Sequence, residues 1–241
     1  MKHLSIGNNA KTIKSDRGGE YLTAIMYMRP NINICPMSKK AACMNGCLNT
    51  AGRGAMNNVQ TARQRKTDAF ESDPIAFVDR LVLDIVKAER KAIKKGVKLC
   101  IRLNGTSDIA WENQAASCGR SLMAIFPHIT FYDYTKLPNR KVPANYYLTV
   151  SYSGANAAYA RKVNKTSHNI AVVFRDGLPN EFMGRIVIDG DVNDLRFTDP
   201  DNVIVGLKAK GKARKDYSGF VIDTDIITIA ANYNPDLLAT G

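Results

Sequence analysis

Three of the five cysteines crowd into one short segment, at Cys35, Cys43 and Cys47. Thiolate sulfur is a ligand for iron and zinc, and such crowding in a reducing compartment indicates metal or redox chemistry. Three thiolates on one loop can hold three irons of a 4Fe-4S cluster and leave the fourth iron open to a chelating ligand. The pattern, with seven and then three residues between the cysteines, therefore predicts an iron–sulfur cluster.

Two other interpretations of the cysteine segment stay open. Zinc would need a fourth ligand, such as His3, His128 or His168, and the spacing fits no common zinc framework. The three side chains could also be ordinary small buried residues, as free cysteine often is. Cys100 falls in a predicted strand and Cys118 in a predicted helix, so both are expected to be structural.

Polar side chains follow two of the predicted strands, at 97–103 and 146–152. Ligands of parallel α/β folds bind beyond the C-terminal ends of the strands, so these side chains are candidates for binding a cofactor or substrate. The candidates are Asn104, Ser107, Asp108, Ser151 and Ser153. The alternative for the first group is a turn in which Ser107 or Asp108 caps the next helix.

The chain is strongly basic, with 34 Lys and Arg against 22 Asp and Glu and a formal net charge of +12. This balance attracts polyanions, so a nucleic acid or a nucleotide is a candidate partner. Alternate lysines of an extended segment would share one face, a geometry suited to a phosphate backbone. The candidate phosphate-binding residues are Lys208, Lys210, Lys212 and Arg214. No RRM-like or helix-turn-helix pattern supports sequence-specific reading.

Strands that alternate with helices must position these residues. Runs rich in β-branched and aromatic residues predict strands at 21–28, 97–103, 129–134, 146–152, 170–174, 185–188, 203–207 and 220–229. Helices are predicted at 55–70, 113–126 and 155–163, and most clearly from Pro74, after an Asp73 N-cap, to Gly96. Such alternation implies parallel pairing through crossovers. The predicted fold class is α/β, a complete or partial (β/α) barrel of parallel strands, with a doubly wound open sheet as the alternative.

Length and composition predict one α/β domain over residues 1–241, with a polar N-terminal arm at 1–19. The 45% of hydrophobic residues is enough for a sizeable core. No apolar stretch reaches the length of a signal peptide or a membrane span, so we expect a soluble, cytoplasmic protein with no membrane partner.

Several stretches of the chain resemble the gene product 88 type of phage protein, which is itself similar to radical S-adenosylmethionine enzymes. They are Cys35-Pro36, Cys43, Cys47, Gly52-Arg53-Gly54, Val59-Gln60, Ala62-Arg63, Asp73-Pro74, Ala76-Phe77-Val78, Arg102-Leu103-Asn104-Gly105, Asp108 and Phe131-Tyr132-Asp133-Tyr134-Thr135. The similarity covers about residues 20 to 155. It implies a partial β/α barrel in the host cytoplasm, with a 4Fe-4S cluster after the first strand. The open iron of that cluster would bind S-adenosylmethionine.

The chain departs from the radical-enzyme pattern in two places. The usual motif is C-x3-C-x2-C with an aromatic residue before the last cysteine, a place that Gly46 holds here. The Gly-Gly-Glu motif that grips the amino group of the cofactor is replaced by residues 104–108, where Ser107 or Asp108 could accept from an ammonium. Two functions therefore stand side by side. One is a radical S-adenosylmethionine-like protein acting on a nucleic acid or nucleotide. The other is a non-catalytic nucleic-acid-binding or host-interacting protein with a structural zinc or a metal-free loop.

Overall fold

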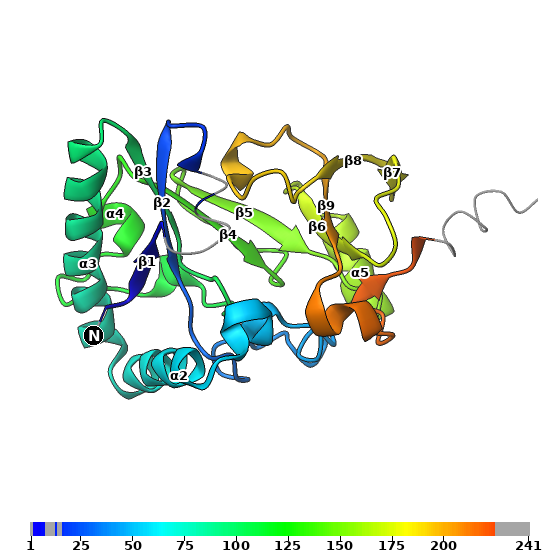
Figure 1. Ribbon diagram of the computed structural model, residues 1–241, viewed down its shortest axis with the longest axis horizontal. Coiled ribbons are helices and arrows are strands. Elements are labelled where there is room, and N and C mark those ends of the chain that lie inside the picture. The colour runs from blue at the N-terminus through cyan, green and yellow to red at the C-terminus, as the bar shows by residue number, and fades with distance from the viewer. Residues whose placement is uncertain (1, 8–12, 14–15, 225–241) are drawn as a thin grey trace, which may run out of the picture.

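The computed structural model describes residues 2–7, 13 and 16–224 (Figure 1). Its strands are β1 (Leu4–Ile6), β2 (Tyr21–Met26), β3 (Lys98–Arg102), β4 (Thr130–Thr135), β5 (Tyr146–Ser151), β6 (Ile170–Phe174), β7 (Glu181–Phe182), β8 (Arg185–Asp189), β9 (Ile204–Lys208) and β10 (Val221–Ile222). Within this part of the chain they form one ten-stranded sheet in the order β1-β2-β3-β4-β5-β6-β9-β8-β7, and β10 pairs with β6. Pairing is parallel from β2 through to β8.

The helices of the described residues are α2 (Asn57–Ser72), α3 (Pro74–Lys94), α4 (Leu122–Ile125) and α5 (Ala157–Asn164). The Asp73 side chain accepts from the Ala76 N–H at 2.9 Å, and Pro74 opens α3, as predicted. The apolar stripe of α3, with Val78, Leu81 and Ile85, joins the core on the face of β2 and β3. Figure 1 shows α3 beside β1 and β2 and α5 beside β6.

The predicted complete or partial (β/α) barrel of parallel strands is wrong. The sheet is mixed, because β1 runs antiparallel to β2 and β7 runs antiparallel to β8. It is also open, since no described strand joins its two ends. The connections explain why. The segment 136–145 between β4 and β5 contains no helix, and β8 leads to β9 through only a short 3-10 helix at Arg196–Thr198. A closed barrel needs a helix after each strand to cover it.

Most predicted elements exist, with shifted ends. Each predicted strand run contains an observed strand, and 225–229 of the last run lies outside the described residues. The helices predicted at 55–70 and 155–163 are α2 and α5. The helix predicted at 113–126 is wrong for most of its length, because only the four residues of α4 are α-helical. Strands β1 and β7 were not predicted.

The sheet splits at the C-terminal end of β5. Strand β5 pairs with β6 only through Val150 and Ser151, and β10 then takes its place beside Val173 and Phe174. The segment that enters β10 therefore crosses the C-terminal ends of the strands, where the Gly154 N–H donates to Gly219 O at 2.8 Å. This crossing segment helps to enclose the candidate site.

Candidate functional site

The cysteine loop, residues 34–47, lies across the C-terminal ends of the parallel strands. Three contacts fix it there. The Asp108 N–H donates to Ile34 O at 2.8 Å, Ser153 Oγ donates to Ala41 O at 2.8 Å, and Ser218 Oγ donates to Ala42 O at 3.2 Å. The loop is thus attached to the segments that follow β3 and β5 and to the segment that enters β10.

The three thiols of the loop are free and half-buried. Cys47 Sγ accepts from the Asn49 N–H at 3.4 Å, and the sulfurs of Cys35 and Cys43 lie 4.0 and 3.8 Å from Thr106 O and Ser38 O. Burial, together with the charges of Asp108 and the other two thiols, raises the pKa of the Cys35 thiol to about 12, although Lys136 lowers it. The three cysteines are therefore close enough to act on one another electrostatically.

Lys136, the first residue after β4, brings a positive charge to the thiols. Burial opposes this charge, but Cys43, Asp108, Cys47 and Cys35 outweigh burial and raise the pKa of Lys136 above its usual value. Its Nζ also lies 5.6 Å from the centre of the Phe220 ring. The sequence interpretation missed Lys136, and its place directly after a strand was the signal that could have found it.

The predicted polar group after β3 divides into two parts. Asn104 and Ser107 belong to an internal network in which Asn104 Oδ1 accepts from Ser107 Oγ at 2.8 Å, from the Ile109 N–H at 3.0 Å and from Trp111 Nε1 at 3.1 Å. Asp108 instead faces the cysteine loop and accepts from Thr135 Oγ1 at 2.7 Å and the Lys136 N–H at 2.8 Å. Cofactor binding by these three residues stays a prediction.

Ser151, the last residue of β5, and Ser153, just beyond it, also have structural contacts. Ser153 is fully buried and holds the cysteine loop through Ala41 O, as above. The carbonyl of Ser151 accepts from the Tyr159 hydroxyl of α5 at 2.6 Å. A role of Ser151 and Ser153 in binding a cofactor stays a prediction.

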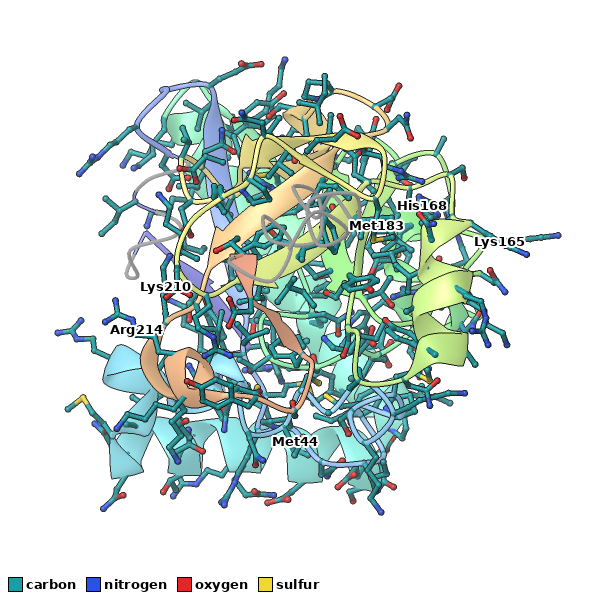
Figure 2. The ribbon with its side chains drawn as sticks, turned by 90° about the vertical axis from the view of Figure 1, so that its right-hand side faces the viewer. Met44, Lys165, His168, Met183, Lys210 and Arg214 are labelled. Carbon is teal, nitrogen blue, oxygen red and sulfur yellow. The ribbon has the colours of Figure 1, made fainter. Side chains whose placement is uncertain are left out.

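The predicted phosphate-binding lysines do not continue along one extended face, because a 3-10 helix begins at Gly211. Lys208 pairs with Asp189 at 3.4 Å, and Lys210 pairs with Asp191 at 2.5 Å. Figure 2 shows Lys210 and Arg214 on one side of this view and Lys165 on the other, so these three residues do not form one patch. Lys212 is exposed, and Arg214 Nε donates to Ala209 O at 3.3 Å. Phosphate binding by these four residues stays a prediction.

Two of the three histidines considered as a fourth zinc ligand, His3 and His128, have carboxylate partners. His3 Nδ1 lies 2.9 Å from Asp84, and His128 Nε2 lies 2.5 Å from Glu89. In the described part of the chain, no three His, Cys, Asp or Glu side chains are grouped so that they could hold a metal ion.

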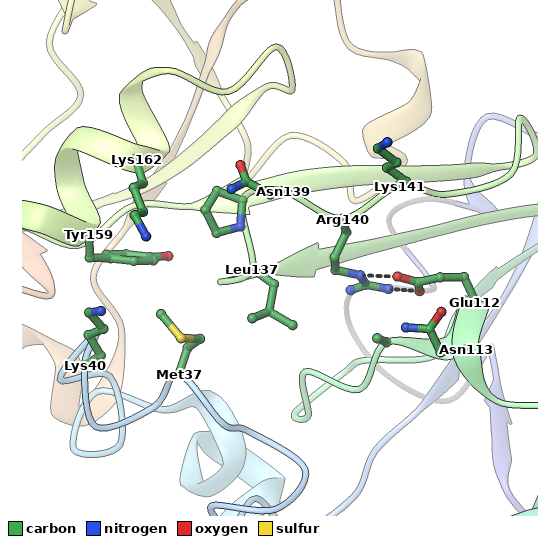
Figure 3. A pocket seen from close by; sticks show the side chains of 12 residues that line it. Met37, Lys40, Glu112, Asn113, Leu137, Asn139, Arg140, Lys141, Tyr159 and Lys162 are labelled. Carbon is green, nitrogen blue, oxygen red and sulfur yellow. Dashed lines mark hydrogen bonds and ion pairs between the residues drawn. The ribbon is translucent and has the colours of Figure 1, made fainter.

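A pocket of about 630 Å³ opens beside the cysteine loop (Figure 3). The cysteine loop contributes Met37 and Lys40, and α5 contributes Tyr159 and Lys162. The segments after β3 and β4 complete the lining with Ala110, Glu112, Asn113, Leu137, Pro138, Asn139, Arg140 and Lys141. The pocket lies where ligands bind in sheets with parallel strands, beyond the C-terminal strand ends.

Fold and site together define a class of protein: an open, mixed α/β sheet whose strand ends carry a three-cysteine loop and a basic pocket. The model of the gene product 88 family matches residues 2–224, and the chain belongs to that family. The resemblance to this type of phage protein is therefore confirmed, while nothing in the match concerns radical chemistry. No curated protein and no solved structure matches the chain. Across the described residues, no helix is both long and apolar enough to span a membrane.

Proposed function

We propose that this phage-type protein binds an iron–sulfur cluster through Cys35, Cys43 and Cys47. The observation that carries the proposal is that three free thiols of one loop lie near the Lys136 ammonium, at the C-terminal ends of the strands. Cys100 offers a contrast, because it is fully buried within β3 and its thiol is 3.5 Å from Thr23 Oγ1. Cysteines that serve only the core have surroundings of that kind.

The spacing of the three cysteines along the sequence favours a cluster over a single zinc ion. Zinc bonds to sulfur are about 2.3 Å long, so the sulfurs around one tetrahedral zinc lie only about 3.8 Å apart. The described residues contain no group of ligands that could hold one ion. In a cubane each cysteine binds a different iron, and the sulfurs stand farther apart. The long interval between Cys35 and Cys43 suits this wider arrangement.

The charge around the loop also fits a cluster. Three thiolates around an oxidised 4Fe-4S core leave about one net negative charge. Lys136 supplies one positive charge at this position, and the Phe220 ring packs against the loop. Such neighbours exclude water and stabilise the charge of a cluster.

S-adenosylmethionine is the ligand that the family resemblance implies for an iron that no cysteine holds. Asp108 is the candidate among the described residues to accept from the amino group of such a ligand, because it faces the cysteine loop. A nucleotide or nucleic acid is the candidate for the molecule acted upon.

The test is the metal content of protein prepared without oxygen. We expect about four irons and four sulfides per chain, a broad absorption band that bleaches with dithionite, and loss of both in a Cys35/Cys43/Cys47→Ala variant. The matched control is Cys118→Ala, which changes an exposed cysteine outside the loop and should keep the iron. Iron that stays absent after reconstitution, or zinc in its place, would refute the proposal. S-adenosylmethionine is then added to the reconstituted protein, and the absence of binding or cleavage would limit the function to holding the cluster.

A further inference from the structure

We propose that the pocket beside the cysteine loop binds a small phosphate-bearing molecule of nucleotide size, with its phosphates between Lys40 and Lys162. This inference deepens the proposed function by naming the class of molecule, but the contacts that carry it involve no cluster. Four cations line the pocket, Lys40, Arg140, Lys141 and Lys162, against the single carboxylate of Glu112.

Lys40 and Lys162 come from different parts of the chain and line the same pocket as Tyr159. Figure 3 shows their side chains on either side of the Tyr159 ring. Both lysines are exposed, and neither has a carboxylate partner among the described residues. An anion bound in this pocket would be attracted by both ammonium groups. Phosphate oxygens are strong acceptors for such donors.

Arg140 adds a donor that the protein itself leaves unused. Its Nε and Nη2 donate to the two carboxylate oxygens of Glu112 at 2.9 and 2.5 Å. Its Nη1 is buried and forms an ion pair with Asp108 at 3.9 Å, but it has no hydrogen-bond partner among the described residues. The Arg140 side chain is only 5% exposed. A buried donor without a partner requires an explanation, and a bound ligand at the wall of this pocket supplies one.

The rest of the lining matches the base and the sugar of a nucleotide. Met37, Leu137 and Pro138 provide apolar surface, while the hydroxyl of Tyr159 is already bonded to Ser151 O and leaves only its ring. Asn113 and Asn139 offer amide groups. The volume of about 630 Å³ lies within the range of about 300–1,000 Å³ typical of small-molecule sites. A flat base with one or two phosphates fits both the walls and the cations.

The test compares three probes by calorimetry at low ionic strength: inorganic pyrophosphate, ADP and adenosine. We expect pyrophosphate and ADP to bind the wild type. Adenosine should bind at least about tenfold more weakly than ADP. A Lys40→Gln/Lys162→Gln variant should lose about tenfold in ADP affinity per lysine. The matched control, Lys94→Gln/Lys95→Gln, removes the same charge from exposed positions of α3 and the residue after it, and should bind as the wild type does.

Three outcomes would overturn the inference. The control variant could lose as much affinity as the pocket variant, which would mean only a general attraction to basic surface. Adenosine could bind as well as ADP. Pyrophosphate and ADP could fail to bind the wild type. Binding of a single-stranded oligo-dT, measured as an additional probe, would not rescue the inference, because it would show only that the protein binds nucleic acid. Thermal unfolding of each variant checks folding, and iron is measured in every sample, so failure of the pocket and failure of the cluster are seen separately.

Discussion

Asp133 places a carboxyl group in the interior, where its ionisation should make the protein less stable as the pH rises. The side chain is fully buried in β4. Its oxygens accept from the Asn104 N–H and from the Tyr146 hydroxyl, both at 2.7 Å. Burial raises the pKa of Asp133 from 3.8 to about 7, against the opposing effect of the Tyr146 hydrogen bond.

The sign and size of the pH effect on stability follow from the difference between the pKa of Asp133 in the unfolded and in the folded protein. In the unfolded chain the carboxyl loses its proton near pH 3.8, while the folded protein keeps that proton up to about pH 7. Stability therefore falls as the pH rises through this interval and is constant with respect to this group above it. One pH unit corresponds to about 1.4 kcal/mol, so the full loss is on the order of 4 kcal/mol, of which about 3 falls between about pH 5 and 8.

An Asp133→Asn variant should lose most of this pH dependence, because the amide cannot ionise. The assay is urea unfolding of the wild type and the variant at a series of pH values from about 5 to 8. The variant should be less stable than the wild type at the acidic end, where the amide nitrogen meets Asn104 Nδ2, and should gain relative to it as the pH rises. Asp201→Asn, at an exposed position, is the matched control. Parallel curves for the wild type and Asp133→Asn would refute the reasoning.

Three further perturbations probe the frame around the site. A Cβ at Gly219 would lie 2.8 Å from Ala155 N, at a φ of +92°. Gly219→Ala should therefore lower the free energy of unfolding by about 1–3 kcal/mol and speed thiol labelling of the cysteine loop. Gly177→Ala, whose Cβ would lie in open space, should do neither. Arg102→Met should lower the free energy of unfolding in urea by about 3–5 kcal/mol, because Asp194, 2.8 Å from Arg102, stays buried as a charge. Adding Asp194→Leu to this variant should recover most of the lost stability. Asp73→Ala should cost about 1 kcal/mol of stability and Asp73→Asn much less, because only the asparagine can still cap α3.

The sequence predicted correctly those helices and strands whose position depends on neighbouring residues alone. The side chain of Asp73 and the ring of Pro74 define the start of α3 without reference to the rest of the chain. The apolar runs that became β3 and β6 carry the same β-branched and aromatic residues that strands favour anywhere. Such features are readable in the sequence because their causes lie within a few residues.

Closure of the sheet depends on causes that lie far apart. The absence of a helix between β4 and β5, and the antiparallel addition of β1, decide that the sheet stays open. Strand β1 has only three residues and lies in a segment that is polar overall, so periodicity could not reveal it. The barrel prediction failed because it counted strands and not the helices needed to cover them.

The sequence indicated where the cysteine loop lies, directly after the first long strand, but not which charges surround it. Asn104 was selected as a ligand-binding residue by its position, yet its side chain is occupied by three donors from its own loop. Lys136 reads in the sequence as a common turn residue, and only the fold brings it to the thiols. Position after a strand indicates where a site lies, but tertiary contacts decide which residues remain available.

Ion pairing distinguishes the lysines of the segment after β9 from the lysines of the pocket, a difference that the net charge does not reveal. Lys208 and Lys210 were prominent in the sequence, but their ammonium groups meet Asp189 and Asp191. Lys40, which lies three residues before Cys43, has no such neighbour in the part of the chain that the structure describes, and it lines the pocket. Since Lys40 and Met37 belong to the cysteine loop, anything that orders this loop also sets one wall of the pocket. Occupancy of the loop and of the pocket would then influence each other by the same free energy in both directions.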